Sequence, residues 1–139
     1  MKRSIFILLL ICTLFVGSSL AFIFYSYFMV YDIKNLPMDV IVSDHYGLNL
    51  DTDALHFGRV KTPGGADRAI IISNTYEHPL KILISARGEM RDWVFINESR
   101  FILNPDEIRN VTFSLNVPEN IAQGNHTGTV KIIFERVLI

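Results

Sequence analysis

An uncharged, apolar stretch near the N-terminus constrains this chain more than any other feature. It runs from Ser4 to Tyr31, and Lys2 and Arg3 stand immediately before it. As an α-helix its 28 residues would reach roughly 42 Å, which exceeds the ~30 Å hydrocarbon core of a bilayer. We therefore predict a transmembrane anchor over residues 1–31, with tilt taking up the excess length.

The basic pair predicts the orientation of this anchor. Lys2 and Arg3 favour a cytoplasmic N-terminus, because positive charge is retained on that side of a membrane. The chain would then cross the cell membrane once, and everything from Asp32 onward would be extracytoplasmic. The single cysteine, Cys12, lies inside the anchor. The outer domain is therefore expected to be held by its core, without an intramolecular disulfide.

The same stretch also admits cleavage as a secretory signal, since Ser19-Leu20-Ala21 loosely matches a processing site. Cleavage there would leave the mostly aromatic segment 22–31 as a new N-terminus in water, which is unfavourable. An anchor explains this segment better, because aromatic side chains concentrate at membrane–water interfaces. We therefore favour a signal-anchor.

Small residues recur every four positions in the anchor, at Thr13, Gly17 and Ala21. This spacing would line one helix face and let two helices approach closely in lipid. It makes these residues a candidate helix–helix contact, either in a homodimer or with another membrane subunit. The alternative is that small residues are simply common in membrane helices.

Beyond the anchor the hydrophobic pattern changes. Residues 32–37 are polar and are predicted to form a stalk, and residues 38–139 show short β-branched and aromatic runs separated by turn residues. The clearest alternation places Val111, Phe113 and Leu115 on one face of a strand. We expect strands near residues 39–42, 55–60, 68–73, 80–86, 93–96, 100–103, 110–117 and 127–137.

About seven strands in roughly 100 residues predict an all-β fold, an immunoglobulin-like antiparallel β-sandwich. Leu55-x-Phe57-Gly58-x-Val60, followed by a Pro-Gly turn and Arg68-x-Ile70-x-Ile72-x-Asn74, resembles the opening of modules of the ASH and major-sperm-protein type. Val117-Pro118 with Gly124, Gly128 and Val130-x-Ile132 resembles their closing hairpin. Such modules also occur in prokaryotic surface proteins, archaeal ones among them. The resemblance implies that Phe57 and Ile70 fill the space between sheets and that Asn74 caps a turn, and it implies protein binding rather than catalysis.

Three Asn-x-Ser/Thr triplets begin at Asn97, Asn110 and Asn125. None has proline in the middle, so all three are formal N-glycosylation acceptors and the chain is a candidate glycoprotein. We expect Asn97 and Asn125 in turns and Asn110 on the solvent face of a strand. The alternative is chance, since such triplets are frequent.

No pattern points to catalysis, a metal or a cofactor. The histidines lack metal-ligand spacing, and Asp51-Thr52-Asp53 lacks the later residues of a calcium loop. No serine has the Gly-x-Ser-x-Gly context of a nucleophile elbow. Outside the anchor eleven Lys and Arg face fourteen Asp and Glu, a net charge of −3 that disfavours nucleic acid as a partner. We expect no enzyme activity.

These observations predict a membrane-anchored, extracytoplasmic protein-interaction or scaffolding module, for example an accessory subunit of a cell-envelope complex. Its partners would be the lipid bilayer and another membrane or surface protein, reached through strand edges or a sheet face. The last strand, which is apolar up to Ile139, is one candidate edge. Alternatively, Val137–Ile139 completes the sheet against the first strand. A carbohydrate- or envelope-polymer-binding domain is the alternative function, with Tyr46, Tyr76 and Trp93 as the few candidate aromatic contacts.

Overall fold

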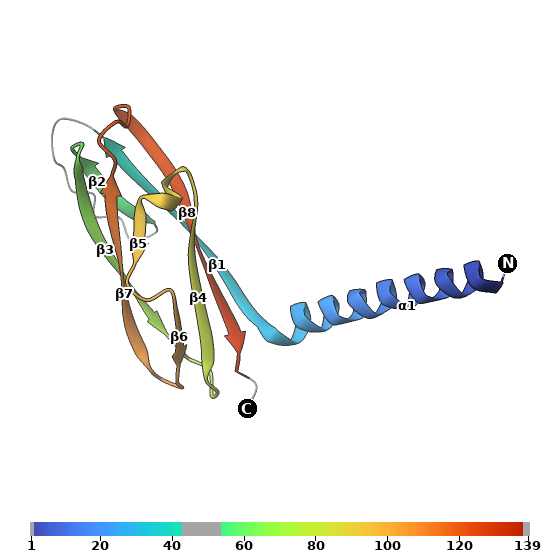
Figure 1. Cartoon of the computed structure of the whole chain (residues 1–139). Helices are drawn as coiled ribbons and strands as arrows, with labels where there is room; N and C mark the ends of the chain where they lie inside the picture. Colours follow the sequence, from blue (N-terminus) through green and yellow to red (C-terminus); the bar gives the residue numbers. More distant parts are fainter. Residues whose placement is uncertain (1, 43–53, 138–139) are drawn as a thin grey trace.

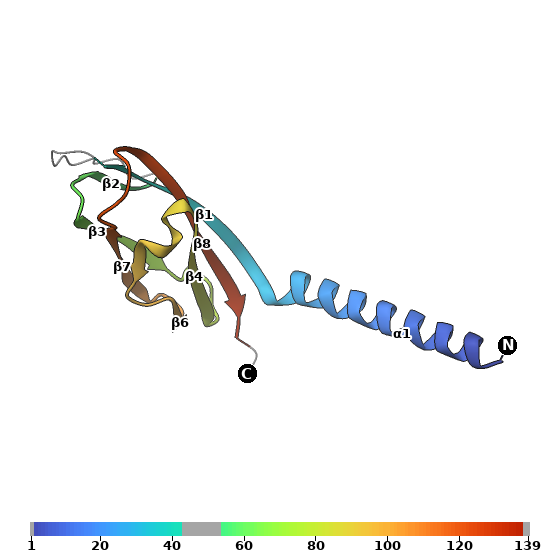
Figure 2. The same cartoon turned by 45° about the horizontal axis from the view of Figure 1, so that its top comes forward.

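The computed structural model describes residues 2–42 and 54–137. Helix α1 (Lys2–Phe24) projects away from a body of strands in both views (Figures 1 and 2). Its side chains from Arg3 onward are exposed, and within the described residues it belongs to the one helical stretch, Arg3–Met29, that is long and apolar enough to cross a membrane. Three hydroxyl side chains in the apolar part of α1 form hydrogen bonds within the helix. Thr13, Ser18 and Ser19 donate to backbone carbonyls one turn earlier, over 2.8–2.9 Å.

The helix passes directly into the sheet. One wider, π-helical turn, η1 (Tyr25–Met29), is followed by strand β1 (Val30–Val42). The predicted stalk at residues 32–37 is therefore wrong, because this segment pairs with the last strand from Asp32 opposite Phe134 to Pro37 opposite Thr129. Polar residues fit there because the strand is partly exposed, and Pro37 fits because β1 has a partner on only one side at that point.

The described residues form eight strands in two sheets, which confirms a mostly β architecture, and each of the eight segments expected to be extended overlaps one of these strands. The five-stranded sheet has the order β2-β1-β8-β4-β6 and the three-stranded sheet β3-β7-β5. All neighbours are antiparallel except β1 and β2, which are parallel. The remaining elements are β2 (Leu55–Val60), β3 (Gly64–Ser73), β4 (Leu80–Gly88), the 3-10 turn η2 (Glu89–Asp92), β5 (Val94–Ile96), β6 (Arg100–Leu103), β7 (Ile108–Val117) and β8 (Gly124–Arg136).

Both sheets contribute to one hydrophobic core. The alternation predicted for β7 is confirmed, since Val111, Phe113, Leu115 and Val117 are all buried. The five-stranded sheet contributes alternate side chains of its strands to the same core. Its buried residues include Met38, Val40, Val42, Phe57, Leu80, Ile82, Ile84, Val130, Ile132 and Phe134.

The motif that resembles the ASH and major-sperm-protein modules spans β2 and β3, and one of its residues departs from expectation. Phe57 is buried as predicted, but Ile70 is only half-buried at the margin of the core. Gly58 has a φ of 78° and lies where the register between β1 and β2 shifts. The glycine therefore serves a β-bulge, where a positive φ is needed.

The strands β5 and β6 are separated by three residues, a spacing typical of a hairpin, but they do not pair with each other. β5 pairs with β7 in the three-stranded sheet, and β6 pairs with β4 in the five-stranded sheet. The chain crosses between sheets at residues 97–99, where Asn97 Oδ1 accepts a hydrogen bond from Thr112 N at 2.9 Å and Ser99 O accepts one from Ile84 N at 2.8 Å. These two bonds attach the crossing segment to both sheets.

Candidate interaction surfaces

The longest unpaired strand edge belongs to β3. This strand spans ten residues, is hydrogen-bonded to β7 and forms the outer edge of its sheet. Opposite it, β2 pairs with β1 only from Met38 to Val42, so the half of β1 from Val30 to Pro37 is also open on one side. Two incomplete edges, one from each sheet, therefore face the same side of the molecule.

A groove of about 740 Å³ lies between these edges. Lys34 and Leu36 of β1 form one wall, and the β3 segment from Arg68 to Ser73 forms the other. Its floor is apolar, and includes Ile132 and Phe134 of β8. The groove is thus hydrophobic inside and bordered by backbone that can still form hydrogen bonds.

A side-chain contact closes one end of this groove. Arg68 Nε donates a hydrogen bond to the backbone carbonyl of His56 in β2, over 2.7 Å. Past the end of β2, no described strand pairs with the free edges of β1 and β3. Ile71 of β3, which is 75% exposed, stands on this edge with no described neighbour covering it. Strand edges with such features can accept an added strand.

The last strand is not an edge. β8 lies in the middle of its sheet, between β1 and β4, and is paired on both sides over most of its length. The interpretation of β8 as a docking edge is therefore wrong for Gly124–Arg136. The alternative, that Val137–Ile139 completes the sheet against the first strand, stays a prediction, because β8 ends at Arg136. Residues 138–139 lie outside the described part of the chain.

A buried carboxylate joins the helix to the sandwich. Glu135 of β8 is 5% exposed and accepts hydrogen bonds from Tyr25 Oη of η1 at 2.6 Å and from Lys81 Nζ of β4 at 3.1 Å. Burial alone would raise the pKa of Glu135, but the bonds from Tyr25 and Lys81 outweigh it and hold the pKa below its ordinary value. Sequence alternation places Glu135 on the solvent side of β8, and only the tertiary structure brings Tyr25 over it.

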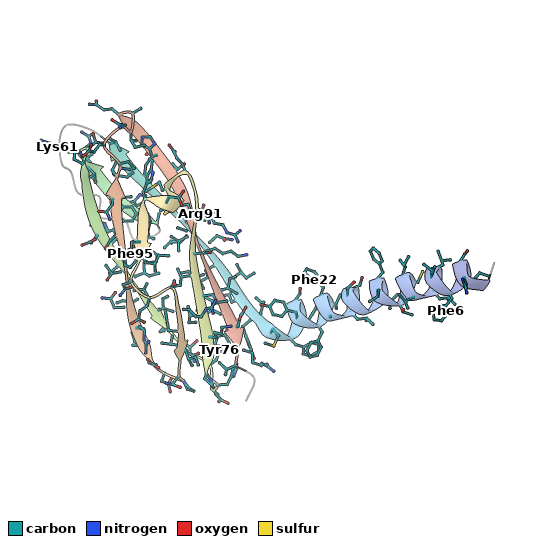
Figure 3. All side chains as sticks on the ribbon, in the orientation of Figure 1. Phe6, Phe22, Lys61, Tyr76, Arg91 and Phe95 are labelled. Carbon is teal, nitrogen blue, oxygen red and sulfur yellow. The ribbon has the colours of Figure 1, made fainter. Side chains whose placement is uncertain are left out.

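Aromatic rings gather at the same end of the sandwich. The Tyr31 ring lies 5.0 Å from that of Tyr76 and 4.9 Å from that of His78, between ring centroids. His78 Nε2 is buried there without a hydrogen-bond partner. The Arg136 guanidinium covers Tyr31 at 5.1 Å from its centroid. Figure 3 shows Tyr76 at this end of the strands, close to where the C-terminal end of the helix meets them.

Asn74 holds the turn that carries Tyr76 and His78. It is 1% exposed, and its Nδ2 donates to the carbonyls of His78 and Leu103, at 2.9 and 3.0 Å. Its Oδ1 accepts from the backbone N–H of Tyr76 at 3.0 Å. The role of Asn74 as a turn cap agrees with the expectation from the sequence.

The three candidate glycosylation residues are exposed but lie on different elements. Asn97 lies in the bend after β5, as expected, and Asn110 lies on β7 opposite Ile71. Asn125 lies within β8, opposite Ile41, rather than in the expected turn. Their accessibility is compatible with modification, which remains a prediction.

The candidate contact residues of the anchor lie on an exposed helix. Thr13, Gly17 and Ala21 are all uncovered, and no atom outside the helix would meet a Cβ added to Gly17 within 4 Å. Thr13 uses its hydroxyl within the helix. No described residue outside the helix covers this face, and its use in a helix–helix contact remains a prediction.

Two histidine–carboxylate pairs were missed by sequence reasoning. Asp39 and His56, opposite each other on β1 and β2, make a close contact through His56 Nδ1. His126 Nδ1 lies 2.6 Å from Glu89 Oε1, and its Nε2 lies 2.9 Å from the Ala122 carbonyl. Within residues 2–42 and 54–137, no group of three or more His, Cys, Asp or Glu is placed to hold a metal ion. His45, Tyr46 and the Asp51–Asp53 segment lie outside the described residues.

Bonds to two acceptors perturb His126. The contact with the Ala122 carbonyl, followed by that with Glu89, raises the pKa of His126 above its ordinary value despite partial burial. Trp93 packs edge-on against this ring at 5.2 Å between centroids, and it also contacts the core. Trp93 therefore packs at the margin of the core and is half-buried.

No family model, curated protein or solved structure matches this chain.

Proposed function

We propose that this chain is a single-pass membrane protein whose outer, immunoglobulin-like β-sandwich docks to another membrane or surface protein as a scaffolding or accessory subunit of a cell-envelope complex. The observation that carries the proposal is the open β3 edge beside the apolar groove. The basic pair at the start of α1, Lys2 and Arg3, supports a cytoplasmic N-terminus and an extracytoplasmic sandwich. Catalysis has no part in this proposal.

The groove fits an extended segment better than a flat protein surface. A strand added beside β3 would pair with its backbone and direct alternate side chains toward Ile132 and Phe134. The other edge strands give less backbone for this purpose, since β2 has six residues, β6 has four and β5 has three. The partner segment is therefore expected to alternate apolar and polar residues.

A carbohydrate-binding function has less support. It usually requires exposed aromatic side chains on one face, but Tyr76 lies near the helix junction and Phe95 on β5 (Figure 3). Trp93 is packed against His126. These three rings do not form one platform, so we retain protein docking as the conclusion.

The test uses a photo-reactive residue at Ile71 in the full chain, expressed in its native membrane. Ile102 of β6 is the matched control, because it is also an exposed isoleucine on an edge strand, at 51% exposure against 75%. We expect a cross-link to one membrane or surface protein from Ile71 and none from Ile102. Ile71→Lys should abolish co-purification of that protein, because charge on a strand edge opposes pairing, whereas Ile102→Lys should not.

Equal cross-linking from both positions, or equal loss of the partner in both lysine variants, would refute docking at β3. Binding of the purified protein on a glycan array, with no protein cross-link, would favour the carbohydrate alternative.

A further inference from the structure

A small hollow lies where the anchor meets the sandwich. It measures about 300 Å³ and is lined by Tyr27 and Phe28 of η1, Val30 and Tyr31 of β1, and Arg136 at the end of β8. The apolar helical stretch ends at Met29. In a chain anchored as proposed above, the hollow therefore lies at the depth where the hydrocarbon core gives way to lipid headgroups.

Arg136 supplies the positive charge of this hollow. Its Nη2 donates to Tyr31 Oη at 2.8 Å, and its guanidinium stacks over the Tyr31 ring at 5.1 Å. A guanidinium carries five N–H donors, so one bond to a tyrosine leaves others directed outward. The side chain is exposed yet positioned by these two contacts, which reduces the entropy lost on binding a ligand.

No carboxylate of the described residues competes for Arg136 within the hollow. Arg136 is the one charged side chain among the described lining residues. The adjacent Glu135 is directed to Tyr25 and Lys81. An anion entering the hollow would therefore meet an arginine that no described carboxylate neutralises.

We propose that this hollow binds the phosphate group of an anionic membrane phospholipid. Arg136 is the principal donor, because guanidinium and phosphate form strong charge-assisted hydrogen bonds. The rings of Tyr27 and Phe28, which are 83% and 58% exposed, lie beside the glycerol and upper acyl region of the same lipid. The proposal rests on the proposed membrane anchoring, but it does not depend on a protein partner at β3.

The test measures lipid binding to the full chain purified in a neutral detergent. Phosphatidylglycerol and phosphatidylcholine are titrated separately, and bound lipid is counted by native mass spectrometry. We expect phosphatidylglycerol to be retained preferentially, and Arg136→Gln to weaken its binding by about tenfold or more, the usual effect of losing a charged hydrogen bond. Arg136→Lys should give an intermediate affinity, since it keeps the charge without the planar donor group.

Arg91→Gln is the matched control. Arg91 is also exposed but lies in η2, farther up the sandwich (Figure 3), and should leave lipid binding unchanged. The fluorescence of Trp93 reports whether each variant is folded. Equal retention of phosphatidylglycerol by the wild type and folded Arg136→Gln would overturn the proposal. So would its complete displacement by millimolar inorganic phosphate, which would indicate a site for a free anion.

Two independent measurements separate this inference from the proposed function. Resistance of the full chain to alkaline extraction from membranes reports anchoring, and cross-linking at Ile71 reports docking. A chain that is anchored and docked but shows no Arg136-dependent lipid binding would refute the lipid site alone. Loss of anchoring would refute the proposed membrane function first.

Discussion

Replacement of Asn74 by alanine should destabilise the sandwich more than any other single change to a polar turn residue. Asn74 is 1% exposed and joins three backbone groups, the carbonyls of His78 and Leu103 and the N–H of Tyr76. Alanine would remove all three hydrogen bonds and leave their partners unpaired. At a net value of about 1 kcal/mol per bond, the free energy of unfolding should fall by about 3 kcal/mol.

The assay is thermal unfolding of the full chain in detergent, followed by the fluorescence of Trp93, the single tryptophan. A loss of about 3 kcal/mol should lower Tm by roughly 12–24 °C for a domain of this size. Asn120→Ala is the control, because Asn120 is exposed in the loop after β7 and makes no described hydrogen bond. Its Tm should stay close to that of the wild type.

A second variant tests the direction of the hydrogen bonds. Asn74→Asp keeps an acceptor for the Tyr76 N–H but places a carboxylate beside the His78 and Leu103 carbonyls. At neutral pH it should be at least as unstable as Asn74→Ala, since it adds an unpaired buried charge. A loss below about 1 kcal/mol in Asn74→Ala, or a stable Asn74→Asp, would refute the argument that these three bonds hold the turn.

Two further predictions concern the perturbed groups. His126 has a raised pKa, so its contribution to stability should be complete below its ordinary pKa of about 6.5 and disappear as the pH rises through the folded-state value. Urea unfolding at pH 6 and pH 8 should show this gain at low pH in the wild type and its absence in His126→Gln; an unchanged pH dependence in the variant would contradict it. Tyr25→Phe removes one donor from Glu135 and should cost about 1.5 kcal/mol at neutral pH, while Tyr27→Phe, at an exposed ring, should cost nothing measurable. The pKa of Glu135 is lowered in the folded protein, so its ionised carboxylate contributes to stability above the ordinary pKa of a glutamate. This contribution is lost as the pH falls through the folded-state pKa. The stabilities of Tyr25→Phe and Tyr27→Phe should therefore converge in acid.

The apolar helix and the β architecture could be predicted from the sequence because both depend on local patterns. A run of uncharged residues from Ser4 onward makes a membrane-length helix whatever the remainder of the chain does. The alternation of β7 likewise shows which residues are buried, since successive side chains of a strand point to opposite faces. Asn74 could be recognised as a cap because its bonds to His78 and Tyr76 are made within four residues.

The point at which the helix ends and β1 begins could not be predicted from local sequence patterns. Tyr31 and the polar residues after it lack a clear pattern, and β1 forms there because β8, about a hundred residues later, supplies its hydrogen bonds. The same long-range pairing places β8 inside its sheet and leaves β3 as the open edge. Strand order depends on which distant segments pair, and periodicity carries no information about it.

The sequence by itself determined that an apolar helix of membrane-spanning length precedes a β domain, because hydrophobicity and strand period are properties of neighbouring residues. Only the tertiary structure decided which surfaces those parts present. The groove beside β3 arises because β2 stops short of it, and the hollow at Arg136 arises because the final strand returns to the end of the anchor. Both sites combine residues far apart in the chain, and their chemistry exists only once the strands have paired.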